Sequence, residues 1–340
     1  MELRNREDRV KAYLVRLLQD NVIFDELSYD FLEKVGVMDE LKDVPVPIMK
    51  KHLDSISTVT LGEGMAFVMG ADPDFEHTDS YIKYINKVLG EEFPKYLINQ
   101  GVETAAANDF DYACILFRAV LLLEPDMPDA LYCYARACKD SYELGDEEDY
   151  IARFKAESIE AFELVTLARP EFDMGFYFLG YGYLNLGLYI KAKLTWDDFM
   201  RLTDGNEEKN ELREEIQGRL SLLEEPINIE KGYNMVLNGD YSDGVNMLQK
   251  YTDSEYKTWW PLWYYLATAK AEQGMVEEAV EDYKVALKYS PSNIEIMERL
   301  IDLSDDQVMI DKYTKKVEVI KRNIEKDEEI RKEMSELKYK

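Results

Sequence analysis

The sequence is poor in cysteine, in histidine and in basic residues. Its 340 residues include 3 Cys and 2 His, and 41 Lys and Arg stand against 69 Asp and Glu, which gives a formal net charge of −28. Binding to nucleic-acid phosphates or to an anionic bilayer depends on clustered Lys and Arg, so this charge disfavours both. It favours basic proteins or basic peptides as partners instead.

The three cysteines are Cys114, Cys133 and Cys138, an odd number without a Cys-x-x-Cys pair. They lie in apolar, helical surroundings, which predicts reduced residues that serve packing. The first eight residues are mostly charged, and no apolar run long enough for a signal peptide or a membrane span follows them. We therefore expect a cytoplasmic protein.

Motifs for catalysis and metal binding are missing. His52 and His77 lie in different elements, and neither has a second His or Cys at metal-ligand spacing. A serine hydrolase needs a histidine beside a nucleophile, and no Gly-x-Ser-x-Gly elbow occurs. These absences predict a chain without catalytic residues, metal or cofactor, and hence not an enzyme.

Two short segments resemble ligand loops only in part. The glycine-rich Leu61–Gly70 lacks both the third glycine of a dinucleotide fingerprint and the Gly-Lys-Ser/Thr of a phosphate loop, which favours a connector. Asp72, Asp74 and Glu76 alternate like the start of a calcium loop, but His77 stands where glycine is expected. We interpret the second segment as an acidic turn.

What the sequence does contain is a repeated internal spacing. Small or apolar residues, with one Asn, recur in steps of seven, five and four at Gly101…Asn108…Ala113…Phe117, Gly180…Gly187…Ala192…Trp196, Gly232…Gly239…Gly244…Leu248 and Ala267…Gly274…Ala279…Tyr283. A fixed spacing of this kind indicates repeated supersecondary units. In the last copy, apolar residues at helical spacing flank Gly274, which predicts two helices separated by a left-handed glycine.

Together with the closing Pro291, this pattern resembles the tetratricopeptide repeat (TPR), with its mid-repeat Gly, its Ala and its aromatic residues. The resemblance covers roughly residues 94–324. It implies an all-α fold, a right-handed superhelical solenoid of TPR helix pairs. It also implies a role in binding proteins.

The spacing between repeats predicts the domain organisation. Equivalent residues are separated by 34, 45, 52 and 35 positions, at Gly101, Ala135, Gly180, Gly232 and Ala267. Against a period of 34, this predicts five units over residues 94–293, with insertions of about 11 residues near 144–150 and about 18 at 207–224. The first insertion is expected to lengthen a loop and the second to form an extra helix. Residues 294–340 are predicted to be a degenerate capping repeat and a charged tail.

Residues 1–93 are predicted to be a mainly helical region with a Gly-rich loop. Apolar periodicity predicts amphipathic helices over residues 3–18 and 24–35, and a third over Ile48–Ile56 after Pro45 and Pro47. Leu61–Gly70 is expected to be a loop or a short strand. We expect this region to pack on the N-terminal end of the repeats.

In the TPR family the first helix of each pair lines a groove, and the resemblance carries this role to one set of residues. These are Tyr132, Arg136, Lys139, Tyr177, Tyr181, Asn185, Tyr233 and Tyr264. Tyrosine offers a large contact area at a low entropy cost, which suits peptide recognition. The alternative is that some of these tyrosines only pack against neighbouring helices. The lysines and asparagines that clamp a chaperone's C-terminal carboxylate in some TPR proteins are absent, so the ligand is expected to be an internal or extended segment.

These observations favour a non-catalytic scaffold or adaptor that binds a protein or peptide segment. The alternative is a peptide-sensing transcriptional regulator with an N-terminal helix-turn-helix, whose recognition helix would be Ile48–Ser57. That segment has few basic residues for phosphate contact. An enzyme with its active site in residues 1–90 has no motif behind it. A homodimer is left open by the sequence.

Overall fold

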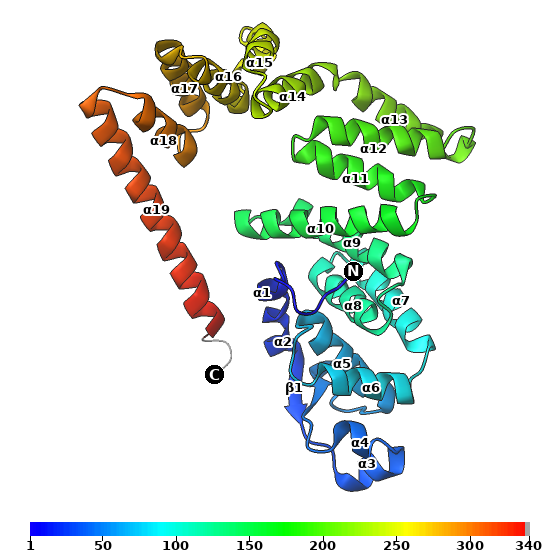
Figure 1. Cartoon of the computed structure of the whole chain (residues 1–340). Coiled ribbons are helices and arrows are strands. Elements are labelled where there is room, and N and C mark those ends of the chain that lie inside the picture. Colours follow the sequence, from blue (N-terminus) through cyan, green and yellow to red (C-terminus); the bar gives the residue numbers. More distant parts are fainter. Residues whose placement is uncertain (337–340) are drawn as a thin grey trace. The chain divides into compact units, whose positions relative to one another are not determined.

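The computed structural model describes residues 1–336 and is all-α apart from one short two-stranded antiparallel sheet (Figure 1). Its contacts divide the chain into two compact units, residues 1–187 with 194–209, and residues 188–193 with the chain from Asn210 onward. No helix of the described chain is long and apolar enough to cross a membrane. Within the same residues, no group of three or more His, Cys, Asp or Glu side chains is placed to hold a metal ion.

The first unit begins with short elements, which differ from the three helices expected there. They are α1 (Lys11–Leu14), α2 (Arg16–Asn21), β1 (Val22–Asp25), α3 (Tyr29–Val35), α4 (Met38–Leu41), β2 (Val46–Met49) and the 3₁₀ turn η1 (Lys50–His52). The first helix starts only at Lys11, where the Asp8 carboxylate accepts the backbone N–H groups of Val10 and Lys11 at 3.2 and 3.1 Å. Residues 1–10 precede it without helix or strand.

The helix predicted over Ile48–Ile56 is wrong, because this segment starts in a strand. β2 pairs antiparallel with β1, with Val22 opposite Met49 and Asp25 opposite Val46. Pro45 and Pro47 have no N–H for a helix, whereas a two-stranded edge tolerates proline. The recognition helix of the DNA-binding alternative, Ile48–Ser57, is therefore not formed.

The Gly-rich segment Leu61–Gly70 is also not a loop. It lies within α5 (Thr58–Ala71), which is buried along most of its length and is followed by α6 (Thr78–Val88). A Cβ atom at Gly64 would lie 2.1 Å from the carbonyl oxygen of Pro47, and one at Gly70 equally close to that of Ile115. The glycines are there because β2 and a repeat helix approach the backbone of α5 directly.

Three helix pairs follow in the first unit. They are α7 (Glu92–Ala106) with α8 (Phe110–Leu123), α9 (Pro128–Leu144) with α10 (Glu148–Ala168), and α11 (Asp173–Asn185) with α12 (Tyr189–Leu202), whose first residues belong to the second unit. Figure 1 shows α7 to α11 stacked in order. The first insertion lengthens α9 and α10 rather than the loop between them. The two helices have 17 and 21 residues and are joined by residues 145–147 alone.

The repeated spacing has a structural cause in both units. Asn108, Gly187, Gly239 and Gly274, the second residue of each pattern, all have left-handed backbones with φ between 63° and 89°, which the sequence predicted for Gly274. The first and fourth residues of a pattern face each other across the helix pair. A Cβ at Gly101 would lie 2.5 Å from the Phe117 ring. Small residues therefore let the large side chain of the second helix lie against the first.

The second unit also contains helix pairs, with irregular elements between some of its helices. After η2 (Glu207–Lys209) come α13 (Asn210–Ser221), α14 (Glu224–Leu237), α15 (Tyr241–Leu248), the 3₁₀ turns η3 (Gln249–Tyr251) and η4 (Glu255–Thr258), α16 (Trp260–Glu272) and α17 (Val276–Tyr289). The extra helix expected at 207–224 is present as α13. α15 has only 8 residues, and the two turns lead the chain into α16.

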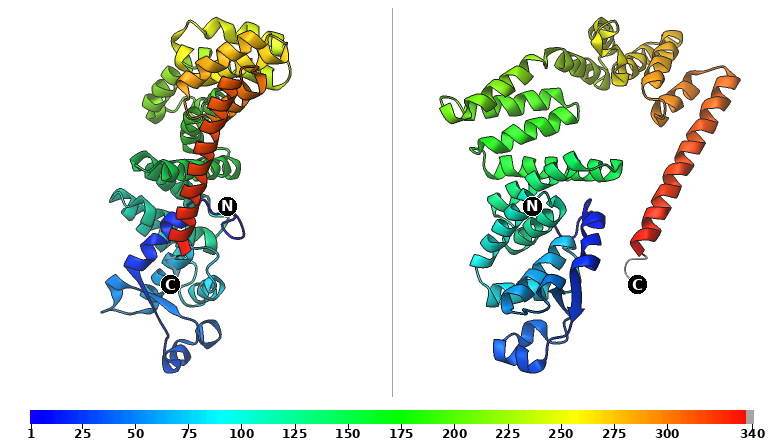
Figure 2. Two further views of the ribbon diagram at one scale, coloured as in Figure 1. Left: turned by 90° about the vertical axis from the view of Figure 1, so that its left-hand side faces the viewer. Right: turned by 180° about the vertical axis from the view of Figure 1, so that it is seen from behind.

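The chain ends in α18 (Ile294–Leu303) and α19 (Gln307–Glu336), the pair predicted to cap the repeats. Tyr313 and Val317 of α19 are buried in one core cluster with Tyr283 and Met297. The views in Figure 2 show α19 continuing far past the end of α18. Residues 337–340 of the predicted charged tail lie outside the described residues.

Candidate protein-binding face

Six of the eight predicted groove residues lie in the first unit, on two helices whose side chains meet. Tyr132, Arg136 and Lys139 project from α9, and Tyr177, Tyr181 and Asn185 project from α11. All are half-buried except Asn185, which is exposed. We call these six residues the tyrosine face. They recur at three- and four-residue intervals, so each helix presents them on one side.

Aromatic rings form a firm base under the α9 part of this face. The Tyr132 ring packs edge-on to Phe172 and Phe162, with ring centres 4.9 and 6.2 Å apart. Phe162 is 2% exposed and stacks on Phe178 of α11 at 5.5 Å. Edge-to-face and stacked pairs of this kind add about 0.5–1.5 kcal/mol each beyond their burial. The rings are therefore held in place before any ligand arrives.

The two basic residues of the face share one aromatic platform. The guanidinium carbon of Arg136 lies 4.2 Å from the centre of the Phe178 ring, and the Lys139 ammonium lies 5.8 Å from it. The Nε atom of Arg136 is shielded from solvent and donates to no acceptor among the described residues. Stacking on the ring orders the guanidinium, one of whose terminal nitrogens also donates to the Tyr132 hydroxyl at 3.4 Å.

Acidic side chains on α9 balance this positive charge. Lys139 donates to Glu143 at 2.5 Å, and Arg136 lies 3.8 Å from Asp140. Both pairs are one helical turn apart and partly exposed, so each adds little to stability. The face therefore combines aromatic area with a nearly neutral set of charges.

Tyr177 and Tyr181 pack against the second helix of their own pair. The Tyr177 ring centre lies 5.4 Å from that of Phe199, and Tyr181 lies 4.9 Å from Trp196. The two tyrosines also touch each other at 5.3 Å. Each ring thus has one side fixed against its own repeat and remains half-buried overall. Both tyrosines therefore make the packing contacts that the alternative interpretation describes.

Asn185 is the last residue of the face, at the C-terminal end of α11. Burial raises the pKa of Tyr142 on α9 above its ordinary value, and the Asn185 side chain acts in the opposite direction. The tyrosine face is joined across α9 and α11 by the contacts of Phe178 with Tyr132 and Arg136.

The remaining two predicted residues lie in the second unit and differ from each other. The Tyr233 ring is half-buried and stacks on Tyr265, with centres 4.7 Å apart. Tyr264 is only 7% exposed, belongs to the core around Tyr283, and donates its hydroxyl proton to Glu295. Burial, followed by the bond to Glu295, raises the pKa of Tyr264 to about 12. Tyr264 is thus a core residue in this structure, and the residue beside Tyr233 is Tyr265.

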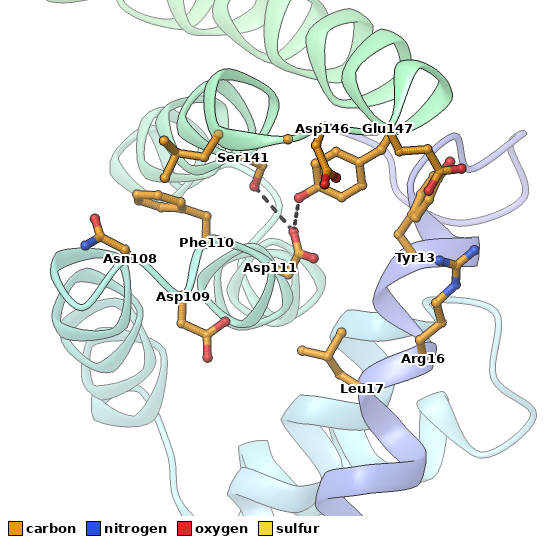
Figure 3. Close-up of a pocket in the computed structure, with 13 residues that line it drawn as sticks. Tyr13, Arg16, Leu17, Asn108, Asp109, Phe110, Asp111, Ser141, Asp146 and Glu147 are labelled. Carbon is orange, nitrogen blue, oxygen red and sulfur yellow. Dashed lines mark hydrogen bonds between the residues drawn. The ribbon is translucent and has the colours of Figure 1, made fainter.

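A pocket of about 380 Å³ in the first unit was not found from the sequence (Figure 3). Its walls come from α1 and α2, the start of α8, and the α9–α10 connection. The lining is rich in carboxylates and aromatic rings, namely Tyr13, Phe110, Tyr150, Asp109, Asp111, Asp146 and Glu147. The acidic stretch near residue 146 was visible in the sequence. That it lines the same pocket as Asp109 depends on how the helix pairs stack.

Asp111 lies at the centre of this pocket's hydrogen bonds. It accepts bonds from the Tyr150 hydroxyl and, at 3.4 Å, from Ser141. Burial raises the pKa of Asp111 above its ordinary value, and the charge of Asp109 adds to this. Arg16, which also lines the pocket, acts in the opposite direction. The pocket's charge suits a cationic group, but Asp111 already has protein partners.

The segment before the first helix is bound to other parts of the first unit. Residues 1–10 are hydrogen-bonded to the loop after α5, to α6, to α8 and to α10. Neither histidine is hydrogen-bonded to a Ser, Thr or Cys within the described residues: His52 lies 2.7 Å from Glu63, and His77 packs against Phe75. The structure therefore adds no nucleophile–base pair to the two histidines.

Comparisons with known proteins give low similarity. No family model matches the chain, and no curated protein matches it. Among solved structures, the P58(IPK) TPR domain is 13% identical, covering 95% of this chain and 81% of that one with a TM-score of 0.45. YrrB, described as a TPR protein with an unusual peptide-binding site, is 17% identical over 64% and 95% with a TM-score of 0.29.

A third structure, a thermophilic TPR protein from Thermus thermophilus, is 19% identical over 62% of this chain and 98% of that one, with a TM-score of 0.28. At these scores the alignments carry no argument about function. The helix pairs, the left-handed residue between their helices and the glycine–aromatic contacts are features of this chain itself. In these features the chain is similar to tetratricopeptide-repeat proteins.

Proposed function

We propose that this chain is a non-catalytic scaffold that binds a protein or peptide segment on the tyrosine face of α9 and α11. The observation that carries the proposal is the arrangement of half-buried tyrosines and stacked Arg136 on a base of packed rings. Rings that are already held lose little conformational entropy on binding. A fixed face of this kind supports recognition and has no group that would perform chemistry.

The partner segment is proposed to be extended and to carry both apolar and charged side chains. Tyrosine rings provide apolar area with a hydroxyl at the edge, and Arg136 provides donors for a carboxylate or a backbone carbonyl. Because the chain as a whole carries a net charge of −28, basic residues elsewhere in the partner would speed its approach.

The experiment that tests this is a selection from a peptide display library. Wild-type protein is compared with Arg136→Glu/Lys139→Glu, which reverses the charge of the face without removing its ring base. The matched control is Lys284→Glu/Lys288→Glu, the same charge change on two exposed residues of α17. Peptides that depend on the face should bind the first variant at least about tenfold more weakly, which corresponds to about 1.4 kcal/mol.

The control variant should keep the wild-type affinity for the same peptides. If the selected peptides bind all three proteins equally, the tyrosine face is not the binding site. Enrichment of no peptide at all would contradict the proposal of an extended ligand.

A further inference from the structure

Residues 1–10, which we call the N-terminal arm, bind to the first unit as an extended peptide would. The arm has no helix or strand, yet two of its apolar side chains are buried: Leu3 is 3% exposed and Val10 is fully buried. Its arginines Arg4, Arg6 and Arg9 pair with acidic residues at least 70 positions away in sequence. The arm is thus held by side-chain recognition rather than by secondary structure.

Two arginines of the arm meet two glutamates of α10. Arg6 donates to Glu157 and, at 2.8 Å, to Glu160, while Arg9 donates to Glu160 and lies 3.5 Å from Glu157. Arg153, also on α10, donates to the backbone carbonyl of Arg9 at 3.3 Å. Two arginines three residues apart therefore match two glutamates three residues apart.

Between these arginines, Asp8 meets a buried cation. Arg118 of α8 is fully buried, and it binds Asp8 with two of its nitrogens and donates to the carbonyl of Gly70 at 2.8 Å. Glu157 is fully buried as well and accepts the Tyr134 hydroxyl at 2.9 Å. Arg118 and Glu157 are also linked to each other through the Tyr134 hydroxyl, which lies 3.5 Å from Arg118. The arm adds a carboxylate for Arg118 and two guanidinium groups for Glu157. An occupant with the charges of the arm therefore suits this surface.

An open groove continues from the place where the arm ends. It has a volume of about 700 Å³ and an apolar floor that includes Ile151, Ala156 and Ile159 of α10. Arg9 and Glu160 line this groove and also belong to the arm's own contacts. The arm cannot fill it, because after Val10 the chain turns into α1, whose Tyr13 and Leu14 are buried.

We propose that the surface of α8 and α10 beneath the arm is a recognition site for an extended segment of another protein. This segment carries the pattern Arg-x-Asp-Arg, followed or preceded by apolar residues. In this structure, the arm occupies the site from within the same chain. The arginines of such a segment replace Arg6 and Arg9, and its apolar residues enter the adjoining groove. This site is separate from the tyrosine face.

The covalent link between the arm and the rest of the chain explains why a partner needs both the charged pattern and the apolar residues to displace the arm. A covalently attached arm acts at an effective concentration of the order of millimolar, so a free segment with only the same contacts is displaced by it. A partner that also fills the apolar groove makes contacts that the arm lacks, and these offset the advantage of the tether. The arm thus sets a threshold that selects for partners with both features.

The test uses a fluorescent peptide with the sequence of residues 1–12 and three full-length proteins. Arg6→Glu/Arg9→Glu repels its own arm from Glu157 and Glu160 and leaves the site open to the peptide. Lys284→Glu/Lys288→Glu carries the same charge change elsewhere. By fluorescence anisotropy, the peptide should bind the arm variant at least about tenfold more tightly than it binds wild type or the control. Equal binding to all three proteins, or no binding to any, would overturn the proposal.

A second variant covers the case in which the arm variant fails to fold. Glu160 is partly exposed on α10, so Glu160→Arg is expected to keep the helix while repelling Arg9. The peptide in which the residue matching Arg9 is Glu should bind Glu160→Arg more tightly than the native peptide does, and wild type should show no such preference. If both peptides bind Glu160→Arg alike, the arginine–glutamate match does not define the site.

Discussion

The glycines of α5 and the glycines of the repeat helices differ in what lies next to them. Gly64 and Gly70 face backbone carbonyl oxygens, of Pro47 and Ile115, at 2.1 Å from the place of a Cβ atom. Gly101 and Gly180 face the aromatic side chains of Phe117 and Trp196. A side chain can turn aside, whereas a backbone that is already hydrogen-bonded cannot. Glycines that look alike in the sequence thus differ in their tolerance to substitution.

The largest effect is expected at Gly70. Gly70→Ala places a methyl group against the backbone of α8, and separating the two helices also disturbs the bond from Arg118 to the Gly70 carbonyl. We expect a loss of about 3 kcal/mol in the free energy of unfolding, in spite of the helix propensity gained by alanine. Chemical denaturation followed by circular dichroism measures it. A variant as stable as wild type would show that α5 and α8 do not approach as closely as described.

A smaller effect is expected at Gly180, where the neighbour is the Trp196 ring. Gly180→Ala should lower the free energy of unfolding by about 2 kcal/mol, and Trp196→Leu should restore part of that loss when combined with it. A double-mutant cycle by denaturation gives the coupling energy. Purely additive effects would mean that the two residues do not share the predicted contact.

Substitutions at Gly274 test the effect of backbone conformation without a packing clash. A Cβ atom there would meet nothing within 4 Å, but its φ of 78° is unfavourable for other residues. Gly274→Ala should therefore cost about 1 kcal/mol, and Gly274→Asn less, because asparagine tolerates the left-handed region. Melting temperatures of both variants, with wild type as reference, check the order. Equal losses would point to a packing cause instead.

Acid should release the N-terminal arm before it unfolds the repeats. Burial alone would raise the pKa of Asp8, but Arg118 and two backbone N–H groups outweigh it and lower the pKa below 3.8. Arg9 and Arg6 likewise outweigh burial at Glu160 and lower its pKa below 4.5. Their contribution to stability is present above the unfolded values and is lost as pH falls through the lowered ones.

We therefore expect the arm to be bound at pH 7 and to be released as the pH falls below 3.8, the ordinary pKa of Asp. A fluorophore at the N-terminus reports this release as a drop in anisotropy, while circular dichroism follows the helices. Anisotropy that stays high until the helices unfold would contradict an arm held by these ion pairs.

The smallest effect on stability is expected on the tyrosine face. Arg136→Glu/Lys139→Glu changes two partly exposed residues and should alter the free energy of unfolding by less than about 1 kcal/mol. The same measurement on Lys284→Glu/Lys288→Glu is its reference. A loss of several kcal/mol would show that Arg136 is a structural residue, and its use as a binding probe would then fail.

A glycine that is required by its own backbone conformation can be predicted from the sequence, whereas a glycine that is required by a distant neighbour cannot. Gly274 was correctly predicted as a left-handed residue between two helices, because that requirement is local and depends on the residue's own φ. Leu61–Gly70 was wrongly predicted as a loop or a short strand, because its glycines serve contacts with Pro47 and Ile115, which are distant in sequence. The pairing of Arg6 and Arg9 with α10 left no signal for the same reason.

The sequence by itself determined the helix pairs, the turn residue between their helices and the extra helix α13, since periodicity and backbone preference are properties of neighbouring residues. The tertiary structure decided that Tyr264 is buried while Tyr177 stays half-exposed, that the first insertion lengthens α9 and α10, and that residues 1–10 bind like a peptide ligand. Each of these depends on which helices meet. That choice follows from the shape and charge of surfaces formed by segments far apart in the chain.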